Sequence, residues 1–428
     1  MTRYLLYTED YPSRSSPRSR KTGIGRYCSD LAAGLTQLGH SVAVLTGDDG
    51  SASLVGSPSE PSVDRVGREP RWPHQLVRRA WMLRRRLARE RPDYLLVGDP
   101  VAHQVVAIAQ LPPGFRYCPM FYGTELGGYR DLLAYGGWQP GRRLRRRTLA
   151  AYIRQAHQPV VISRYTARRL AALGLPPRRE CVVFPAVSDR FLTQPVGAVG
   201  VDDRIAGRSA SGVDDPVRFI TVARISERKN QRQVLETLAT LRRQHGLRFE
   251  YVMVGNVDSP EHGSYLESIR RFIREHRLED SVRLIDRATD EEKVAWIDAS
   301  DVFVMLSRTV GHSVEGFGIS VIEASCRGKP VVVSDQGGMP ETIIEGQTGF
   351  AVPLDSLEAI AAPLLKLARQ PALRETLGAN GSRFVRGNFT PRRMGERLAA
   401  HMHALEGAPI VASTARYASP GTHTPVRS

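Results

Sequence analysis

The residues best placed for chemistry are two glutamates eight positions apart, Glu315 and Glu323, on either side of a glycine-rich turn. The apolar run from Ile319 to Ser325 predicts a short helix, whose start carries unpaired N–H groups and partial positive charge that favour a phosphate. Glu323, about one turn into that helix, can accept hydrogen bonds from a diol such as that of ribose. The N–H groups expected to face the phosphate belong to Phe317, Gly318 and Ile319.

Two cations are expected near the same ligand. Arg224 and Lys229 follow a predicted strand at 218–222 and precede a predicted helix at 231–244. The forked guanidinium of arginine suits the oxygens of a diphosphate, and lysine adds a second positive charge. Such a pair of cations, when it stands alone, is usually a solvated surface feature. The same holds for an isolated pair of glutamates. The strand end, the flanking glycines and the strand predicted at 331–333 favour a binding site instead.

Strands and helices alternate through both halves of the chain, which predicts an α/β fold with two Rossmann-like, doubly wound parallel sheets. Ligands bind at the carboxyl ends of such strands, so two facing domains would enclose a cleft. In the first half we expect strands at 4–8, 42–45, 94–97, 119–122, 159–162 and 181–184 and helices at 75–91, 142–156 and 165–173. In the second half we expect strands at 218–222, 249–254, 282–285, 301–306 and 331–333 and helices at 231–244, 265–276, 290–299, 357–369 and 391–405.

The composition shifts of the chain predict its domains. A Gly-, Ser- and Asp-rich stretch low in aromatic residues is typical of a linker, and a Ser/Thr/Pro-rich end is typical of a disordered tail. We expect an N-terminal domain, a linker, a C-terminal domain, a helix that crosses back to the first domain and a tail, over residues 1–192, 193–216, 217–385, 386–406 and 407–428.

Glycines near the N-terminus suggest a weaker nucleotide signal. Gly23 and Gly25 precede an amphipathic helix that ends at Gly39. The order of strand, glycine loop and helix invites a dinucleotide site, but Cys28 stands where G-x-G-x-x-G needs its third glycine. The segments at 10–22 and 50–72 are rich in Ser, Pro or Gly and are expected to be irregular.

The composition limits the possible partners. The 428 residues carry a net charge of +16, almost all of it from arginine, and contain no apolar run long enough for a membrane span. The N-terminus lacks a signal peptide's apolar core, and four scattered cysteines indicate reduced thiols in a cytosolic protein. Basic helices at 75–91 and 142–156 favour a solvated face over contact with the inner face of a membrane. No nucleic-acid module accompanies them.

The glutamate turn resembles a known family. Glu315-Gly-Phe-Gly followed by Glu323-Ala is similar to the E-x7-E signature of the retaining family 4 glycosyltransferases, which have the GT-B fold. Gly337-Gly338 with Pro340-Glu341 is similar to the segment that follows it in that family. The resemblance covers about residues 1–405, strongly in the second half and loosely in the first.

The resemblance implies a role for each matching residue. Glu315 would hold sugar hydroxyls, Glu323 the ribose, and Arg224 with Lys229 the diphosphate of a nucleotide sugar. A glycine loop would close over the phosphates, a turn would line the nucleotide, and a strand end would flank the base. Gly23 and Gly25 match the glycine loop, Gly255 matches the turn, and Ile285 matches the strand end.

The first half departs from the family pattern. The family's His-Gly-Thr is Tyr122-Gly123-Thr124 here, so Tyr122 takes the place of the histidine that reaches the donor sugar. A phenol can still donate a hydrogen bond but does not become positively charged at neutral pH. Thr124 and Glu125 are expected on the acceptor side. The family's Pro-Asn-Gly-Val-Asp is Pro-Ala-Val-Ser-Asp at 185–189.

The sequence thus predicts a retaining glycosyltransferase that moves a sugar from a nucleoside-diphosphate sugar, most simply a UDP-sugar, to a hydroxyl acceptor. Because no D-x-D occurs, we expect no metal ion, and we expect no cofactor. Arg224, Lys229 and the helix start would take the place of the metal. Two alternatives stay open: a nucleotide-sugar isomerase or phosphorylase of the same fold, and a non-catalytic protein that binds a sugar nucleotide.

Overall fold

The computed structural model describes residues 1–12, 23–47, 60–66, 73–112, 114–134, 140–175, 180–194, 215–256 and 260–406. Most of the expected linker, the expected tail and the expected loop before Gly23 lie outside these residues. So do the side chains of 132–146, which include most of the second basic run.

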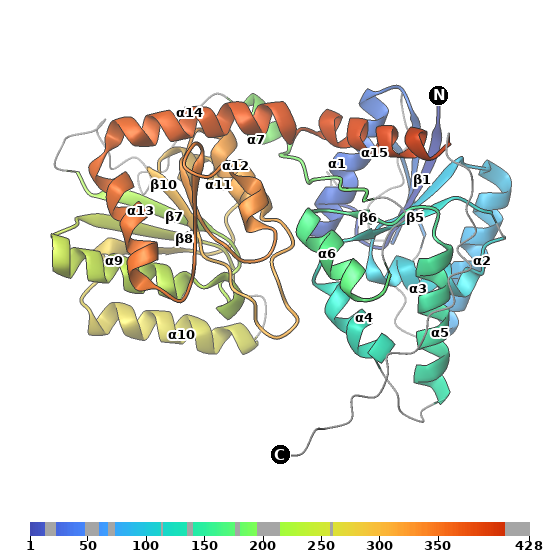
Figure 1. The fold of residues 1–428 in the computed structure, drawn as a ribbon, viewed down its shortest axis with the longest axis horizontal. Coiled ribbons are helices and arrows are strands. Elements are labelled where there is room, and N and C mark those ends of the chain that lie inside the picture. The colour runs from blue at the N-terminus through green and yellow to red at the C-terminus, as the bar shows by residue number, and fades with distance from the viewer. Residues whose placement is uncertain are drawn as a thin grey trace, which may run out of the picture.

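The first half is a six-stranded parallel sheet in the order β3-β2-β1-β4-β5-β6, covered by helices on both faces (Figure 1). Its strands are β1 (Arg3–Thr8), β2 (Ser41–Thr46), β3 (Ser62–Arg65), β4 (Tyr94–Val97), β5 (Tyr117–Phe121) and β6 (Val160–Val161). Its helices are α1 (Gly23–Gln37), α2 (Pro73–Glu90), α3 (Pro100–Ala109), α4 (Glu125–Ala134), α5 (Pro140–Gln155), α6 (Arg164–Ala172) and α7 (Asp189–Thr193). The inner strands are apolar because both faces of the sheet are buried, as the fully buried β4 and β5 show.

The second half repeats the plan in the order β12-β11-β10-β7-β8-β9, all pairs parallel. Its strands are β7 (Val217–Val222), β8 (Phe249–Val254), β9 (Val282–Ile285), β10 (Val302–Met305), β11 (Val331–Ser334) and β12 (Gly349–Val352). Its longer helices are α9 (Gln231–His245), α10 (Pro260–Glu275), α11 (Asp290–Asp298), α12 (Ile319–Cys326), α13 (Leu357–Arg369) and α14 (Pro371–Asn388). Its described residues also form three short 3₁₀ turns: η1 (Glu227–Lys229), η2 (Glu279–Ser281) and η3 (Met339–Thr342).

The last helix, α15 (Pro391–Glu406), leaves the second half and packs on α1 of the first (Figure 1). Glycines allow the close approach of the two backbones. A Cβ on Gly34 would lie 1.8 Å from the carbonyl oxygen of Pro391, and a Cβ on Gly395 would lie 2.6 Å from the carbonyl carbon of Gly34. The chain therefore joins the two halves a second time, beyond the segment at 195–214.

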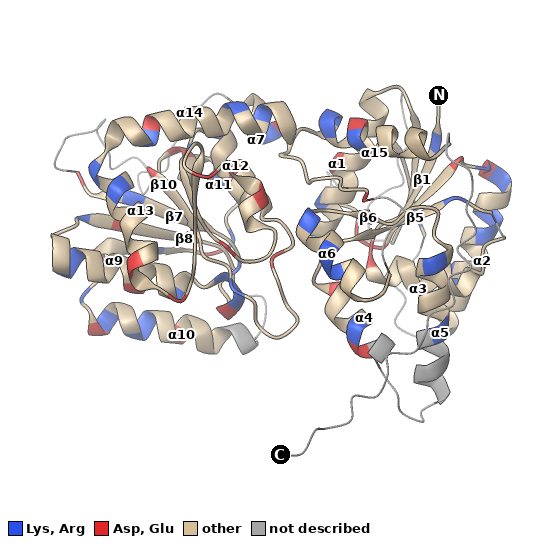
Figure 2. Ribbon diagram, viewed as in Figure 1, with Lys and Arg blue, Asp and Glu red and all other residues tan. Residues whose placement is uncertain are grey.

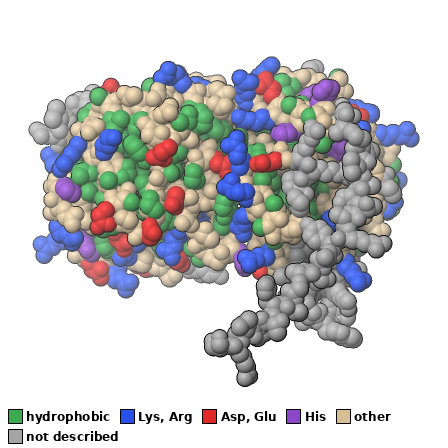
Figure 3. Space-filling view, in the orientation of Figure 1, with side chains coloured by type: hydrophobic (Ala, Val, Ile, Leu, Met, Phe, Trp, Pro, Cys, Tyr) green, Lys and Arg blue, Asp and Glu red, His purple; other side chains and the backbone are tan. Residues whose placement is uncertain are grey.

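Basic side chains are spread unevenly over the surface. Figure 2 shows Lys and Arg along α2, α5 and α6 of the first half, and Figure 3 shows more of them along the boundary between the two halves. Within the part of the chain that the structure describes, no helix is both long and apolar enough to cross a membrane.

The expected α/β fold with two parallel sheets is confirmed, but several element predictions were wrong. The segment 181–184 forms only a bridge between Val161 and Val182, not a strand of the sheet. Residues 62–65, expected to be irregular, form the edge strand β3. Gly23 and Gly25 form the first turn of α1 instead of a loop before it. The sequence interpretation omitted α3, α4, β12 and α14.

Candidate active site between the two halves

The loop between β10 and α12 carries Glu315, and two cations from η1 hold its carboxylate. Glu315 Oε2 accepts a hydrogen bond from Arg228 Nη1 at 2.6 Å and another from Lys229 Nζ. All three side chains are largely buried. Two of the residues predicted to act together, Glu315 and Lys229, are therefore in direct contact.

The charges of this cluster shift the protonation of its members. Burial by itself raises the pKa of Glu315, but Lys229 and Arg228 more than offset it and bring that pKa to about 2. Burial lowers the pKa of Lys229, against the attraction of Glu315 and with the repulsion of Arg228. Glu315 therefore stays ionised at neutral pH, and it balances charge that a bound diphosphate could also balance.

Glycines fix the backbone around Glu315 because other chain segments lie against it. A Cβ on Gly316 would lie 1.9 Å from the carbonyl oxygen of Tyr122 in the first half. A Cβ on Gly337 would lie 2.2 Å from the carbonyl oxygen of Glu315, and one on Gly338 would lie 2.1 Å from that of Gly316. The N–H of Gly338 donates to the carbonyl oxygen of Glu315 at 3.0 Å. Gly337 and Gly338 thus pack directly against the backbone of the Glu315 turn.

Helix α12 begins without a side-chain cap. Gly318 occupies the capping position with a φ of +107°, a conformation that glycine adopts at little cost. The Phe317 ring is buried against Phe184 and Phe389, with ring centroids 5.6 Å from each. Phe317 can therefore offer a ligand only its backbone, while Ile319 opens the helix half-buried.

Glu323 meets an arginine from the other half of the molecule. Its Oε1 lies 2.5 Å from Nη1 of Arg26 on α1, and the Glu323 side chain is almost completely buried. This contact is an ion pair, and neither Glu323 Oε1 nor Arg26 Nη2 has a hydrogen-bond partner of good geometry among the described residues. Burial raises the pKa of Glu323, and the positive charge of Arg26 opposes that rise.

Three further predicted residues stand at adjacent strand ends of the second sheet. Arg224 follows β7 and is exposed, and its carbonyl oxygen accepts from Gln231 Nε2 at 2.7 Å. Gly255 follows β8, and its N–H donates to the carbonyl oxygen of Ile285 in β9 at 2.9 Å. A Cβ on Gly255 would lie 1.8 Å from the carbonyl oxygen of Ala223. Gly255 thus keeps the ends of β7, β8 and β9 close together.

The structure directs the Tyr122 hydroxyl into the first half, not toward the second. The hydroxyl donates to the carbonyl oxygen of Gly98 at 2.6 Å and lies 3.6 Å from the sulfur of Cys28. Glu125, at the start of α4, accepts from the N–H groups of Tyr122 and Gly123 at 2.5 and 3.2 Å. The sugar-side role of the Tyr122 hydroxyl stays a prediction, and it requires the phenol to leave Gly98.

The remaining predicted residues lie in the first half. Thr124 is exposed at the turn after β5. Gly25, in the first turn of α1, lies close to Asp10, since a Cβ there would be 2.7 Å from Asp10 Oδ1, whereas a Cβ on Gly23 would meet nothing within 4 Å.

The sequence interpretation did not single out Arg228 or Arg26. It named Glu341 but did not predict its contact with the other half. Both Glu341 carboxylate oxygens accept 2.8 Å hydrogen bonds from the N–H groups of Arg164 and Tyr165, at the start of α6. The sequence offered a signal for the two arginines, since Arg228 adjoins Lys229 and Arg26 adjoins Gly25.

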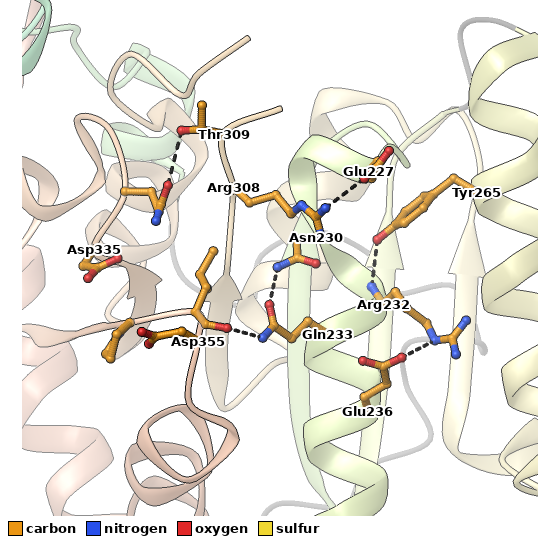
Figure 4. A pocket seen from close by; sticks show the side chains of 13 residues that line it. Glu227, Asn230, Arg232, Gln233, Glu236, Tyr265, Arg308, Thr309, Asp335 and Asp355 are labelled. Carbon is orange, nitrogen blue, oxygen red and sulfur yellow. Dashed lines mark hydrogen bonds and ion pairs between the residues drawn. The ribbon is translucent and has the colours of Figure 1, made fainter. Parts of the chain in front are cut away.

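A polar cavity of about 780 Å³ opens near the carboxyl ends of β7, β10, β11 and β12 (Figure 4). Arg308 pairs with Glu227 across it at 2.9 Å, and Thr309 donates to Gln336 at 3.2 Å. None of the predicted site residues lines this cavity. Among the described residues, no three His, Cys, Asp or Glu side chains gather as a metal-binding group.

Two parallel six-stranded sheets, each covered by helices, are the arrangement of the GT-B glycosyltransferase fold. Two solved structures share this fold. A sucrose-phosphate synthase from Thermosynechococcus elongatus superposes with a TM-score of 0.71 at 19% identity over 96% of this chain and 100% of its own. The Anabaena protein HepE in complex with UDP-glucose superposes with a TM-score of 0.68 at 17% identity over 94% of this chain and 100% of its own.

The sequence matches identify the family. Residues 204–384 match Glycosyl transferases group 1, and residues 21–190 match Glycosyltransferase Family 4. The chain belongs to this family of glycosyltransferases.

Two curated relatives show how far the likeness extends. A GDP-mannose-dependent alpha-(1-6)-phosphatidylinositol monomannoside mannosyltransferase of Mycolicibacterium smegmatis is 32% identical over 56% of this chain and 60% of its own length. The amylovoran biosynthesis glycosyltransferase AmsK of Erwinia amylovora is 29% identical over 49% of this chain and 47% of its own. The chain thus spans only about half to 60% of the length of these relatives.

Proposed function

We propose that this protein transfers a sugar from a nucleoside-diphosphate sugar to a hydroxyl acceptor, with retention of configuration at the anomeric carbon. The observation that carries the proposal is the Glu315 cluster. A family 4 chain that holds this carboxylate with Lys229 and Arg228 beside the start of α12 has an anion site next to a group that accepts hydroxyl hydrogen bonds.

The proposed reaction breaks the bond between the anomeric carbon and the phosphate oxygen. The electron pair leaves on the diphosphate, where Arg224, Lys229 and the N–H groups at the start of α12 would stabilise it. The acceptor oxygen forms the new bond on the same face of the sugar, and its proton passes to the departing diphosphate. The protein supplies charge and positioning in this scheme, with no protein nucleophile and no metal ion.

The donor base is the first point to test. The sequence favours a UDP-sugar, and one relative is named for its dependence on GDP-mannose, so both donors are candidates. Thermal-shift titration with UDP-, GDP-, ADP- and TDP-sugars should show stabilisation by one base class, and the effect should be lost in Arg224→Ala and Glu323→Ala. Stabilisation by none of them would contradict the proposal.

Product analysis separates transfer from the two alternatives. Incubation with the stabilising donor and a panel of hydroxyl acceptors should release nucleoside diphosphate in proportion to the sugar transferred. Interconversion of the nucleotide sugar or its cleavage by phosphate, without an acceptor, would instead indicate an isomerase or phosphorylase. Donor binding without turnover would favour the non-catalytic alternative. In that case Tyr122 would need no contact with the donor sugar.

We also propose that the protein works in the cytosol at the inner face of a membrane, using α2. Val77 and Trp81 on this helix are 59% and 56% exposed, and the Arg85 guanidinium lies 4.6 Å from the Trp81 ring centroid. Apolar side chains flanked by arginine suit an anionic lipid surface. Sedimentation with phosphatidylglycerol vesicles but not with phosphatidylcholine vesicles is expected, and Trp81→Ala should weaken it. Equal sedimentation of the variant would contradict this surface.

A further inference from the structure

The ion pair of Arg26 and Glu323 joins the two halves of the molecule. Among the described residues, it is the one ion pair between the first half and a residue proposed to bind the donor. Arg26 lies at the end of the first turn of α1, and its Nε is also 3.8 Å from Asp30 Oδ2 one turn further along. Its guanidinium carbon lies 5.8 Å from the Phe191 ring centroid. The guanidinium is therefore fixed from three sides, and one of them is the carboxylate of the opposite half.

Glu323 has acceptor capacity left over in this pair. The contact with Arg26 engages Oε1, and no hydrogen bond to Oε1 is found among the described residues. Arg26 Nη2 is likewise buried without a hydrogen-bond acceptor. A hydroxyl group both donates and accepts, so it matches an unused acceptor beside an unused donor.

The surroundings of Glu323 make the arginine necessary. The other charges that face the pair are Asp30 on α1, Asp189 on α7, and Asp290 with Lys293 on α11. Three of these four are acidic, and burial also disfavours a negative charge. Without Arg26, a carboxylate at this position would tend to take up a proton and lose part of its capacity to accept hydrogen bonds.

We propose that Arg26 is a positioning residue, which reaches across from α1 to hold Glu323 ionised and oriented for the ribose diol of the donor. The inference rests on the proposed function, since it assigns the nucleotide ribose to Glu323. It adds a dependence of donor binding on the approach of the two halves, because the residue that prepares the ribose site belongs to the half opposite the one that carries Glu323.

The test compares ribose with deoxyribose. The affinities of GDP and UDP and of their 2′-deoxy forms are measured by calorimetry for the wild type, Arg26→Gln and Arg26→Lys. We expect the wild type to prefer the ribonucleotide by about tenfold, which is 1.4 kcal/mol, and Arg26→Gln to lower that ratio until it is close to one at pH 6. Arg26→Lys should restore part of it, because the charge is kept.

The pH dependence provides a readout that a loss of packing would not change. With Arg26→Gln, the ribonucleotide preference should fall as the pH is lowered from 8 to 6, because Glu323 then binds a proton more readily. The wild type should keep its preference across this range. A matched control is Arg190→Gln, which removes an arginine that pairs with Glu291 at 2.7 Å at the same interface but does not touch Glu323. It should leave the ratio unchanged.

A double-mutant cycle closes the argument, since Arg26→Gln should change nothing further in Glu323→Gln. An unchanged or higher ribose preference in Arg26→Gln would overturn the inference, because Arg26 would then be neutral or a competitor for Glu323. A wild type that binds none of these nucleotides would overturn the proposed function and, with it, this inference, and that result differs from binding without discrimination.

Discussion

Glu315 acts as an internal anion for Lys229 and Arg228, so removing its charge should separate binding from turnover. In Glu315→Gln the two cations lose their partner and become available to a diphosphate. We expect nucleoside diphosphate to bind at least as tightly as to the wild type, while sugar transfer falls about a hundredfold or more, because a group proposed to hold the sugar in the transition state is lost. Calorimetry and initial rates measure the two effects.

A matched control for this variant is Glu227→Gln in the same turn, where the carboxylate pairs with Arg308 at 2.9 Å and both side chains are exposed. Exposed pairs contribute little, so this variant should bind and turn over like the wild type. Weaker binding of the diphosphate to Glu315→Gln would mean that Glu315 orders the cations instead of competing for them.

Tyr122 offers a second test at the level of one atom. Its hydroxyl satisfies the carbonyl oxygen of Gly98, so Tyr122→Phe should lower the free energy of unfolding by about 1–2 kcal/mol and change kcat by less than about threefold. Chemical denaturation and initial rates are the measurements. A large loss of kcat at unchanged stability would instead show that the phenol leaves Gly98 and reaches the donor sugar.

Helices α1 and α15 approach closely because Gly34 has no Cβ, so the packing of α15 on the first half depends on this glycine. In Gly34→Ala the new Cβ would meet the carbonyl oxygen of Pro391, and α15 must shift. Overpacking of this kind costs about 1–3 kcal/mol of the free energy of unfolding. The control is Gly387→Ala in α14, where a Cβ meets nothing within 4 Å and the helix should gain about 0.5–1 kcal/mol. Equal stability of the two variants would contradict this account.

The elements that the sequence predicted are those with a local signal. The strands β7, β8 and β11 are buried along nearly their whole length and are rich in apolar residues, which is typical of strands in a parallel sheet. Two of the missed helices contain glycine, which disfavours a helix. Helix α4 carries Gly127 and Gly128, and α14 carries Gly378, whose Cβ would lie 1.9 Å from the carbonyl oxygen of Gly328. Helix α3 did have a signal, since Asp99 caps it ahead of Pro100.

The candidate site was predictable where its chemistry is local in sequence. The spacing of Glu315 and Glu323 and the glycines between them follow from one turn and one helix. The pairing of Arg26 with Glu323 joins residues from different halves, and no periodicity announces which arginine among many will meet a given carboxylate. The hydroxyl of Tyr122 illustrates the same limit, because its partner Gly98 follows a neighbouring strand.

At the scale of the molecule, one short segment of the second half makes most of the contacts with the first that involve the candidate site. Gly316 lies against Tyr122, Glu323 pairs with Arg26, and Glu341 binds the start of α6. His312 adds a contact with Asp131, at 3.4 Å. The segment that is proposed to bind the donor therefore also makes contacts that depend on how closely the two halves approach.

Glu341 tests whether these contacts hold the halves together. Its carboxylate satisfies two N–H groups at the positive end of α6, which would otherwise face water. In Glu341→Ala we expect hydrogen exchange at Arg164 and Tyr165 to rise at least about tenfold, because opening at this contact then costs less free energy. The matched control is Glu345→Ala, whose carboxylate accepts from Ala351 within its own half at 2.8 Å and should leave α6 unchanged. Donor affinity should fall with the first variant alone, since the loosened interface also moves Arg26 away from Glu323. Unchanged exchange at α6 in Glu341→Ala would mean that α15 and the remaining contacts hold the halves without it.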